Sequence, residues 1–413
     1  MNRTNTVEVL IEKIVPDGFG LAHAENLTIF VPLVAPGDRV RVRIERKKGK
    51  VAFAELVEIL EPSADRVEPP CPHFGVCGGC DFQQLNYAAQ LRAKVEIIRD
   101  CLRRIGKIDW QKEVEIVPSP DAWNYRTRAQ WKRSGKRMGY FERKSHRVCE
   151  VRVCPILTET LQKTLQSARG NFDFAELRVA ASGKKVSLGA ANTGTNGEPD
   201  ENFYAANKIE EENDRTDVTS RKSKAEEINL KIGEFNYSFS ADVFFQVNHA
   251  LLPDFVETAI GKVEGNLALD LYCGVGLFTL PLAAKFNRVF GIEGNRSSIE
   301  FAKSNAKNAD LKNAGFHVST VGKWILENEQ KLAGTDFVLL DPPRSGAEAE
   351  TIEALIRLRP AKIVYVSCNP ATLARDLRAL SAGGFEIENV RAFDFFPQTH
   401  HVETVVHLFL KVS

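Results

Sequence analysis

The sequence predicts an α/β protein with a doubly wound C-terminal domain, an N-terminal β-barrel and a β-rich region between them. Three observations support this fold class. Strand-like and helix-like patterns alternate from Phe244 onward, as in a doubly wound parallel sheet. Short apolar runs separated by turn residues fill residues 6–60, and a longer β-rich stretch follows them. The chain has 413 residues, 43% of them hydrophobic, which is enough length for two or three domains. We expect three domains with the ranges 1–61, 62–243 and 244–413.

The N-terminal region reads as a series of short strands. Turn signals at Pro16–Gly18 and Pro36–Asp38 interrupt the apolar runs. The expected strands are Val7–Ile14, Phe19–Ala22, Thr28–Val31, Arg39–Ile44 and Val51–Ile59. Five strands in so short a stretch predict a small closed barrel of the OB type, which is a common platform for oligonucleotides.

The central region begins with a proline-rich connector, Pro62–Pro72, and a cysteine cluster. A helical pattern then runs from Phe82 to about Ile105, with one apolar face formed by Leu85, Leu91, Val95, Ile98 and Leu102. We expect this helical segment, at about 83–112, to pack on the C-terminal domain. A β-rich stretch follows from Glu113 to Phe239, and within it the polar residues 192–229 are expected to form an exposed insertion.

The composition limits the location and the partners of the protein. Met1–Glu12 has no apolar signal-peptide core, and no apolar run is long enough to span a membrane. We therefore expect a cytoplasmic protein, in which the eight cysteines are metal ligands or catalysts rather than disulfides. Nothing in the sequence requires a protein partner, so we expect a monomer.

The net charge is only +1, so a nucleic acid would have to bind local basic patches. The first patch lies on an expected hairpin and comprises Arg39, Arg41, Arg43, Arg46, Lys47, Lys48 and Lys50. In the second, basic and aromatic residues alternate: Trp123, Tyr125, Arg126, Arg128, Trp131, Lys132, Arg133, Lys136, Arg137, Tyr140, Phe141, Arg143, Lys144 and Arg147. Such a mixture suits single-stranded RNA, with cations on phosphates and rings on bases. The alternative for both patches is a pair of solvated strand faces.

Three cysteines lie close together in the segment Cys-Pro-His-Phe-Gly-Val-Cys-Gly-Gly-Cys. They are Cys71, Cys77 and Cys80, and the glycines allow the chain to wrap around one inorganic centre. Cys154 is the best candidate for a fourth ligand, and Cys149 is its competitor. Zinc is the alternative, but structural zinc sites pair short C-x2–4-C elements. A spacing of five residues and a remote fourth thiol count against zinc, and together with the family resemblance described below they favour a 4Fe-4S cluster.

A glycine loop follows a buried strand at 267–272. Gly274 and Gly276 let the backbone approach a ligand at the carboxyl edge of a sheet. Glu293 follows the next strand, where an acid can accept hydrogen bonds from ribose hydroxyls. The full dinucleotide fingerprint is absent, because Thr279 stands where its third glycine would be. The loop therefore favours S-adenosylmethionine over a dinucleotide.

Two further strand ends carry reactive side chains. The strand Phe337–Leu340 ends in Asp341, which could accept a hydrogen bond from the imide N–H of a uracil. The next strand ends in Cys368, whose thiol indicates covalent catalysis, although a cysteine there can also be a small buried hydrophobe. Glu403 lies between apolar strand residues, which would raise its pKa and suit a general base; the alternative is an edge-strand salt bridge. His400 and His401 are expected to be supporting residues.

Taken together, these motifs resemble the RNA 5-methyluridine methyltransferases, most of all the iron–sulfur 23S rRNA (uracil-5-)-methyltransferases. The resemblance covers nearly the whole chain. The barrel resembles the TRAM domain of that family, and the four cysteines resemble its 4Fe-4S site. Phe244–Asn248 resembles the family segment F-x-Q-V-N, and Ser367–Asp376 resembles the nucleophile motif. Leu277 departs from the family, where a polar Asn is frequent.

The resemblance implies a role for each candidate residue. Cys368 would be the nucleophile, Glu403 the general base and Asp341 the contact to uracil and cofactor. The residues expected to bind the cofactor are Gln246, Tyr272, Gly274, Glu293 and Asp341.

The implied function is S-adenosylmethionine-dependent methylation of carbon 5 of a uridine, with 23S rRNA as the expected RNA and a covalent Cys-uracil adduct. A transfer RNA is the alternative substrate. The rivals from other classes are a non-catalytic RNA-binding or assembly iron–sulfur protein and a dinucleotide-dependent oxidoreductase.

Overall fold

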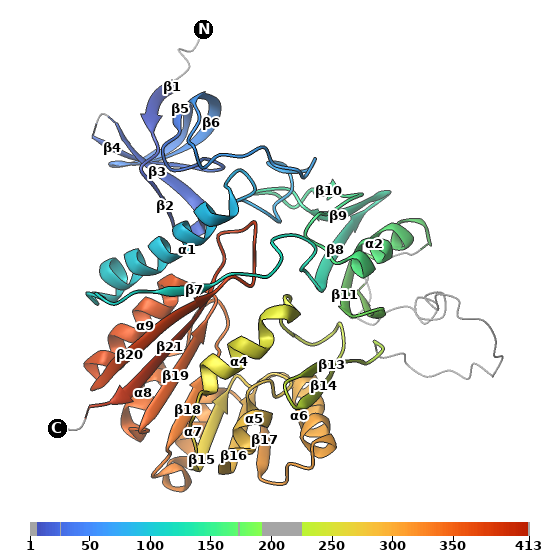
Figure 1. The fold of residues 1–413 in the computed structure, drawn as a ribbon, viewed down its shortest axis with the longest axis vertical. Helices are drawn as coiled ribbons and strands as arrows, with labels where there is room; N and C mark the ends of the chain where they lie inside the picture. Colours follow the sequence, from blue (N-terminus) through green and yellow to red (C-terminus); the bar gives the residue numbers. More distant parts are fainter. Residues whose placement is uncertain (1–5, 25, 172–173, 192–224, 412–413) are drawn as a thin grey trace.

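The computed structural model describes residues 6–24, 26–171, 174–191 and 225–411. The N-terminal barrel lies at one end, the catalytic sheet at the other, and a smaller antiparallel sheet beside them (Figure 1). In these described ranges, no helix is long and apolar enough to cross a membrane.

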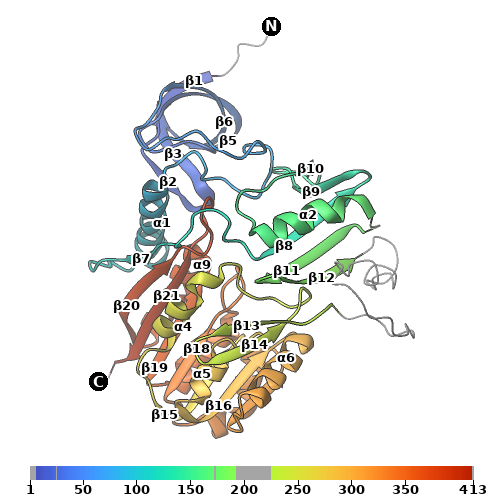
Figure 2. The ribbon, with the colours of Figure 1, turned by 45° about the vertical axis from the view of Figure 1, so that its right-hand side comes forward.

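The barrel has one strand more than the sequence predicts. Its sheet order is β1-β5-β6-β4-β3-β2. The strands are β1 (Thr6–Leu10), β2 (Lys13–Val15), β3 (Phe19–Ala24), β4 (Leu27–Val31), β5 (Arg39–Lys48) and β6 (Val51–Glu61). The expected strand Val7–Ile14 bends at Ile11, so that β1 pairs with β5 whereas β2 pairs with β3. This bend connects the two ends of the sheet, and it closes the barrel visible in Figure 2.

Helix α1 (Tyr87–Cys101) joins the barrel end to the catalytic end. The side chain of Asn86 caps it by accepting a hydrogen bond from the Ala89 backbone N–H. The predicted apolar face was partly wrong, because Leu91 and Val95 are only half-buried. Two polar residues, Gln90 and Lys94, are buried instead. The apolar residues of the buried face belong to the same core as helix α9 and the catalytic sheet: Ala89, Ala93, Ile97, Ile98 and Cys101.

The central sheet is antiparallel, with the order β10-β9-β8-β11-β12. Its strands are β8 (Arg128–Ser134), β9 (Arg137–Phe141), β10 (Val148–Glu150), β11 (Glu176–Ser182) and β12 (Lys185–Ala191), and α2 (Glu159–Asn171) packs against it. The short strand β7 (Glu115–Val117) was expected here but pairs with β20 at the edge of the catalytic sheet. Of the expected insertion 192–229, residues 192–224 lie outside the described ranges. Its end belongs to the hairpin β13 (Ile228–Ile232) and β14 (Phe235–Phe239).

The catalytic sheet has the order β17-β16-β15-β18-β19-β21-β20-β7. Its strands are β15 (Gly265–Leu271), β16 (Phe286–Glu293), β17 (Ala314–Val318), β18 (Phe337–Leu340), β19 (Lys362–Ser367), β20 (Phe385–Phe393) and β21 (Glu403–Leu410). Strands β15 to β19 are mutually parallel, whereas β21 runs antiparallel between β19 and β20.

Helices cover both faces of this sheet, which confirms the predicted doubly wound architecture. One core contains α4 (Leu252–Ile260), α5 (Thr279–Ala283) and α6 (Arg296–Asn308). The other contains α7 (Val321–Asn328), α8 (Ala349–Leu358) and α9 (Pro370–Ala382). Strand residues alternate between the two cores: Leu267, Leu269 and Leu271 belong to one, and Ala268 to the other. All the parallel strands therefore deliver their carboxyl ends to one common edge.

Candidate active site

The predicted reactive residues gather at the carboxyl edge of the parallel strands. Tyr272 and Gly274 follow β15, Glu293 ends β16, Asp341 follows β18 and Cys368 follows β19. Glu403 reaches the same edge from the opposite chain direction, because it is the first residue of the antiparallel strand β21.

Glu403 and Cys368 are neighbours because of strand register. Ser367 pairs with Thr404, so the residues just beyond this pair, Cys368 and Glu403, lie side by side. Glu403 is only 4% exposed, and this burial raises the pKa of its carboxyl well above the usual value. Burial, followed by the nearby charge of Glu403, also raises the pKa of the Cys368 thiol to about 12. In the ligand-free protein the thiol therefore holds its proton.

Asp341 is the third ionisable group in this pocket. Burial raises the pKa of its carboxyl to about 7, and the charge of Glu293 adds to the effect. The Asp341 backbone N–H donates to the Leu271 carbonyl at 3.2 Å, which ties the turn after β18 to the end of β15. Arg344, in the same turn, lowers the pKa of both Cys368 and Glu403 and so partly offsets their burial.

The segment after Cys368 holds the Asp341 turn in place. The Asn369 side chain caps α9 and also donates to the Arg344 carbonyl at 3.1 Å. Arg375 donates to the Ser345 carbonyl at 3.1 Å. Asp376 accepts hydrogen bonds from the Tyr365 hydroxyl at 2.7 Å and from the Ala347 N–H at 3.0 Å. No individual roles were predicted for Asn369, Arg375 and Asp376. The signal was an acidic residue on the otherwise apolar buried face of α9.

The glycine loop is a tight turn held by Glu293. Tyr272, Gly274 and Gly276 all have positive φ, at 64°, 53° and 92°. A Cβ on Gly276 would lie 2.9 Å from the Leu280 side chain, and the φ of 92° is itself unfavourable for a residue with a side chain. Glu293 accepts a hydrogen bond from the Gly274 N–H at 3.2 Å and so holds the loop against the end of β16. The Tyr272 hydroxyl donates to the Glu348 carboxylate.

Gln246 lies in the loop after β14 and is buried. Its side-chain oxygen has no hydrogen-bond partner among the described residues. Buried polar atoms are rarely left unpaired, so this oxygen marks a place where a ligand donor would fit.

Asn305 of α6 was not predicted as a site residue. Its amide donates to the Val275 and Ser238 carbonyls, both at 3.1 Å. It thereby joins the glycine loop to the β13–β14 hairpin.

The four predicted cysteine ligands line one cavity of about 170 Å³. Cys149, the competitor of Cys154, is buried in the central sheet and does not line it. Burial raises the pKa of Cys77 to about 12, and it also raises the pKa values of Cys80 and Cys154. Within the described ranges, no three His, Cys, Asp or Glu side chains come close enough together to hold a single metal ion.

The cysteine cavity and the Cys368 pocket share a wall. Arg344 and His401 both line the cavity, and the Arg344 guanidinium approaches the His401 Nε2 at 3.3 Å. Burial lowers the pKa of His401 to about 2, so its ring is neutral and can accept this hydrogen bond. Two motifs that are far apart in the sequence are therefore adjacent in the fold.

The first basic patch is partly neutralised by carboxylates of its own barrel. Arg41 pairs with Glu58 and with Glu8, the latter at 2.8 Å. Arg43 pairs with Glu55. The cations at the strand tip, Arg46, Lys47, Lys48 and Lys50, remain exposed.

Part of the second basic patch is structural. Trp131 is fully buried in the central sheet. Arg128 donates to backbone carbonyls of residues 240–243. Lys132 pairs with Glu176. For these residues the RNA-contact prediction was wrong, because strand packing and local pairing already account for them.

We expect Asp341→Asn to raise the Tm of the ligand-free protein by more at about pH 8 than at about pH 5. Between the unfolded pKa of about 4 and the folded pKa of about 7, the native carboxyl keeps a proton that the unfolded chain has lost. Its contribution to stability therefore falls as pH rises through this window, and asparagine removes the effect. Thermal denaturation of both proteins at the two pH values measures it. The exposed Asp310→Asn is the control, and equal Tm shifts for Asp341→Asn at both pH values would contradict the assignment.

Comparison with known proteins gives two family matches. The tRNA (uracil-5-)-methyltransferase family matches residues 210–321 and 327–411. The TRAM domain of tRNA (uracil(54)-C(5))-methyltransferases matches residues 7–64.

Relatives align over almost their full length. The chain is 34% identical to an uncharacterized RNA methyltransferase of Aquifex aeolicus, over 98% of this chain and 99% of the relative. It is 31% identical to the 23S rRNA (uracil(1939)-C(5))-methyltransferase RlmD of Shewanella frigidimarina, over 94% and 92%. The crystal structure of Pyrococcus abyssi tRNA (uracil-54, C5)-methyltransferase in complex with S-adenosyl-L-homocysteine superimposes with a TM-score of 0.72 at 27% identity, covering 97% and 100%.

These matches leave the oxidoreductase and the non-catalytic RNA-binding protein without support. They agree with the parallel sheet, the glycine loop and the N-terminal barrel described above. The chain belongs to the TRAM-containing family of S-adenosylmethionine-dependent RNA (uracil-5-)-methyltransferases.

Proposed function

We propose that this protein methylates carbon 5 of a specific uridine in 23S ribosomal RNA through a covalent adduct with Cys368. The observation that carries the proposal is the meeting of Asp341, Cys368 and Glu403 at one sheet edge. The charges of both carboxyls raise the pKa of Cys368, and the charge of Asp341 also raises the pKa of Glu403. All three groups lie at the same sheet edge as the glycine loop. A thiol and two carboxyls suit nucleophilic addition to a uracil ring followed by proton removal.

The proposed reaction uses Cys368 to activate a ring carbon that is a poor nucleophile. The Cys368 thiolate adds to carbon 6 of uracil, which forms the Sγ–C6 bond and turns the ring into an enolate with electron density at carbon 5. S-adenosylmethionine, when bound, supplies an electrophilic methyl group to that carbon. Glu403 then takes the proton from carbon 5. The released electron pair forms the C5–C6 double bond, the Sγ–C6 bond breaks, and the thiolate returns.

Two groups must lose protons before this sequence can run. Burial favours the protonated forms of Cys368 and Glu403 in the free protein, and Arg344 opposes that effect. Asp341, in the same pocket, offers an acceptor for the uracil imide N–H. The target uridine must leave its stack to reach the half-buried thiol, so we propose that it flips into the pocket.

We propose that Gln246, the Gly274 turn and Glu293 hold S-adenosylmethionine. The unpaired buried oxygen of Gln246 can accept hydrogen bonds from a cationic amino group. The carboxylate of Glu293 stands at the end of β16, where ribose hydroxyls can reach it. The turn through Tyr272 and Gly274 lets the backbone approach the cofactor closely.

We also propose that Cys71, Cys77, Cys80 and Cys154 hold a 4Fe-4S cluster. The four cysteines line one cavity, and a cavity with thiols on its wall has room for a cluster of several atoms. Arg126 lines the same cavity, so a cation lies beside the anionic site. The cluster would cross-link the central region, and no step of the reaction requires electron transfer.

An RNA strand would be held outside the pocket. Between the barrel and the central sheet lies an open groove of about 410 Å³, lined in part by Phe19, Tyr140, Phe141, Arg143 and Lys144. Next to Phe19 on the barrel, Phe30 and Phe53 stack at 5.3 Å, and Arg46 lies 4.6 Å from the Phe53 ring. Half-exposed rings next to cations suit stacked single-stranded bases. We assign the groove to RNA.

We also propose that the chain is divided into three domains, with the ranges 1–61, 62–243 and 244–413.

The proteins similar to this chain include one that acts on ribosomal RNA and one that acts on transfer RNA. RlmD of Shewanella frigidimarina, at 31% identity, acts on 23S rRNA. The Pyrococcus abyssi enzyme, at 27% identity, acts on a tRNA. We therefore propose 23S rRNA and keep tRNA as the second candidate substrate.

The direct test is a mass-spectrometric map of 5-methyluridine in rRNA and tRNA from cells that lack the gene. We expect one or more 23S rRNA sites to lose the methyl group, and the wild-type gene to restore it. Cys368→Ala should not restore it, whereas the buried Cys101→Ala, which removes a thiol outside both sites, should. A loss confined to tRNA would select the alternative substrate, and no change in either RNA would reject the function.

We expect Glu403→Gln to accumulate a covalent protein–RNA adduct in the presence of S-adenosylmethionine. The amide cannot accept the carbon 5 proton, so elimination of the Cys368 thiolate is blocked after methyl transfer. A denaturing gel with labelled RNA measures the adduct. Glu386→Gln, an exposed substitution on β20, should turn over without accumulation. Rapid turnover by Glu403→Gln without adduct would show that another group takes the proton.

The fourth ligand can be decided by a matched pair of cysteine substitutions. We expect Cys154→Ser to lower iron content and cluster absorbance, because Cys154 lines the cavity. Cys149→Ser should retain both, because Cys149 lies outside it. Iron and sulfide assays of anaerobically purified protein give the result. Zinc with no sulfide in the wild type would reject the cluster.

A further inference from the structure

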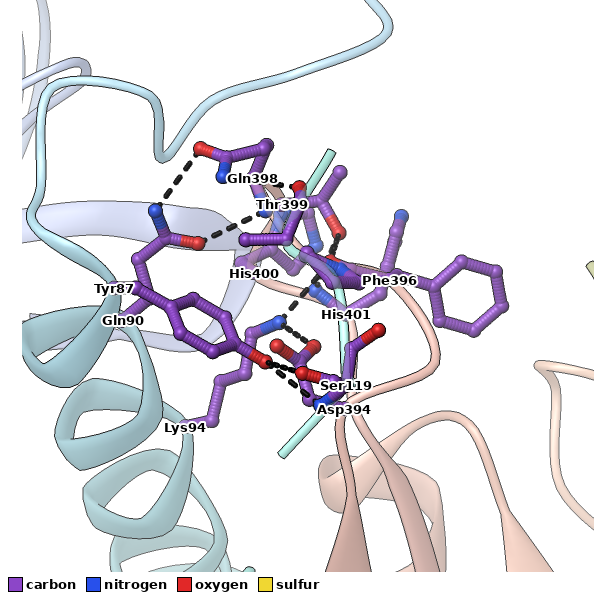
Figure 3. Close-up of polar contacts among 12 residues, drawn as sticks. Tyr87, Gln90, Lys94, Ser119, Asp394, Phe396, Gln398, Thr399, His400 and His401 are labelled. Atoms are coloured by element: carbon purple, nitrogen blue, oxygen red, sulfur yellow. Dashed lines mark hydrogen bonds and ion pairs between the residues drawn. The ribbon is translucent and has the colours of Figure 1, made fainter. Parts of the chain in front are cut away.

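The nine residues that lead into Glu403 are held mainly by parts of the chain outside the catalytic sheet. Residues 394–402 connect β20 to β21, and Glu403 is the first residue of β21. The positions of Glu403 and of His401 therefore depend on how this connection, the 394–402 loop, is fixed. Figure 3 shows side chains of α1 pointing at it.

A buried ion pair fixes the beginning of the 394–402 loop. Lys94 and Asp394 are both fully buried, and the Lys94 ammonium pairs with the Asp394 carboxylate. The same ammonium donates to the Phe396 carbonyl at 3.0 Å (Figure 3). Removing lysine and aspartate from water is costly, and α1 could be stabilised equally well by an apolar residue at this position. Since the buried Lys94 ammonium also donates to a loop carbonyl, we attribute its presence to the need to hold the loop in position.

A pair of glutamines fixes the middle of the 394–402 loop. The Gln90 side-chain oxygen accepts from the Gln398 backbone N–H at 2.9 Å, and its amide donates to the Gln398 side-chain oxygen at 3.0 Å. Gln398 has φ of 70°, a left-handed conformation that is unfavourable for a residue with a side chain. Gln90 thus holds the loop in a conformation that Gln398 would not favour alone.

The segment after the cysteine ligand Cys80 fixes the end of the 394–402 loop. The backbone N–H groups of Asp81 and Phe82 donate to the Gln398 carbonyl at 3.1 and 3.0 Å. The Asp81 carboxylate accepts from the His400 N–H at 2.9 Å and lies 2.5 Å from the His400 Nδ1. His401 then turns toward Arg344 and the cysteine cavity.

We propose that Lys94, Gln90 and Asp81 are positioning residues that hold the 394–402 loop so that Glu403 can take the carbon 5 proton. This rests on the proposed role of Glu403 and adds residues of α1 and of the cysteine segment to the same reaction. The positioning residues touch neither substrate nor cofactor. They act on the step after methyl transfer, and addition of Cys368, whose turn is fixed by α9, does not depend on them.

The test measures the two steps separately in one single-turnover reaction. RNA labelled with tritium at carbon 5 of uridine reports proton removal as tritium release, and a denaturing gel reports the covalent adduct. We expect Gln90→Ala and Lys94→Met to slow tritium release by about tenfold to a hundredfold, the usual cost of a misplaced catalytic group. Adduct formation should keep its wild-type rate, so the adduct should accumulate as it does in Glu403→Gln.

Arg92→Met is the matched control, because it removes an exposed cation from the same helix. It should behave as wild type. Lys94→Met leaves Asp394 buried without its cation, so Lys94→Met/Asp394→Asn is measured as well; it removes the charge pair together with the bond to the loop carbonyl. If Lys94→Met fails to fold, the double variant and Gln90→Ala give the result.

A parallel loss of adduct formation and tritium release, or no loss of either, would overturn the proposal. The first result means that the network only stabilises the fold, and the second that the loop needs no external support. Failure of Glu403→Gln itself to accumulate adduct would instead reject the proposed chemistry, so the two failures are distinguishable.

Discussion

The pairing of β21 with β19 is the constraint on which the site depends. The Ser367–Thr404 pair sets Glu403 next to Cys368, although the two residues come from different ends of antiparallel strands. Side chains alternate between the faces of a strand, so a slip by one residue would turn Glu403 away from the thiol. The antiparallel direction of β21 matters equally, because a parallel strand would bring only its carboxyl end to this edge.

That register concentrates ionisable groups in a region with little water. Asp341 is near enough to raise the pKa of Glu403 further in the direction set by burial, and the charges of both carboxyls raise the pKa of Cys368. Such an arrangement weakens the ligand-free protein near neutral pH and leaves it ready for a cationic cofactor and an uncharged base. The fold compensates elsewhere, through the large cores on both faces of the sheet and the hydrogen bonds from α9 to the Asp341 turn. Stability and reactivity are thus supplied by different residues.

Much of this could be predicted from the sequence, because Asp341 and Cys368 directly follow short apolar runs and Glu403 begins another. Asp341 and Cys368 end buried strands, and strand ends of a parallel sheet share one edge. The features that were not predicted correctly depend on contacts between segments that are far apart in the sequence. The burial of Lys94 could not be foreseen, since its partner Asp394 lies 300 residues away in the chain. Two further features depend on which strands pair, and a local sequence pattern does not indicate this. They are the placement of β7 beside β20 and the bend between β1 and β2. Trp131 shows the converse error: an aromatic residue among cations resembled a stacking platform but fills the central core.

The central claim, that Cys368 bonds to carbon 6 of a uridine placed beside Glu403, is tested most directly by peptide mass spectrometry. The protein is incubated with S-adenosylmethionine and with RNA that carries 5-fluorouridine at the target site. In this RNA, fluorine stands in place of the proton that Glu403 would remove, and fluorine cannot leave as a cation. The account predicts a stable methylated nucleotide adduct on the peptide that contains Cys368. An adduct on any other cysteine would contradict the account. So would the absence of any adduct, provided that the same RNA with uridine at the target site is methylated normally.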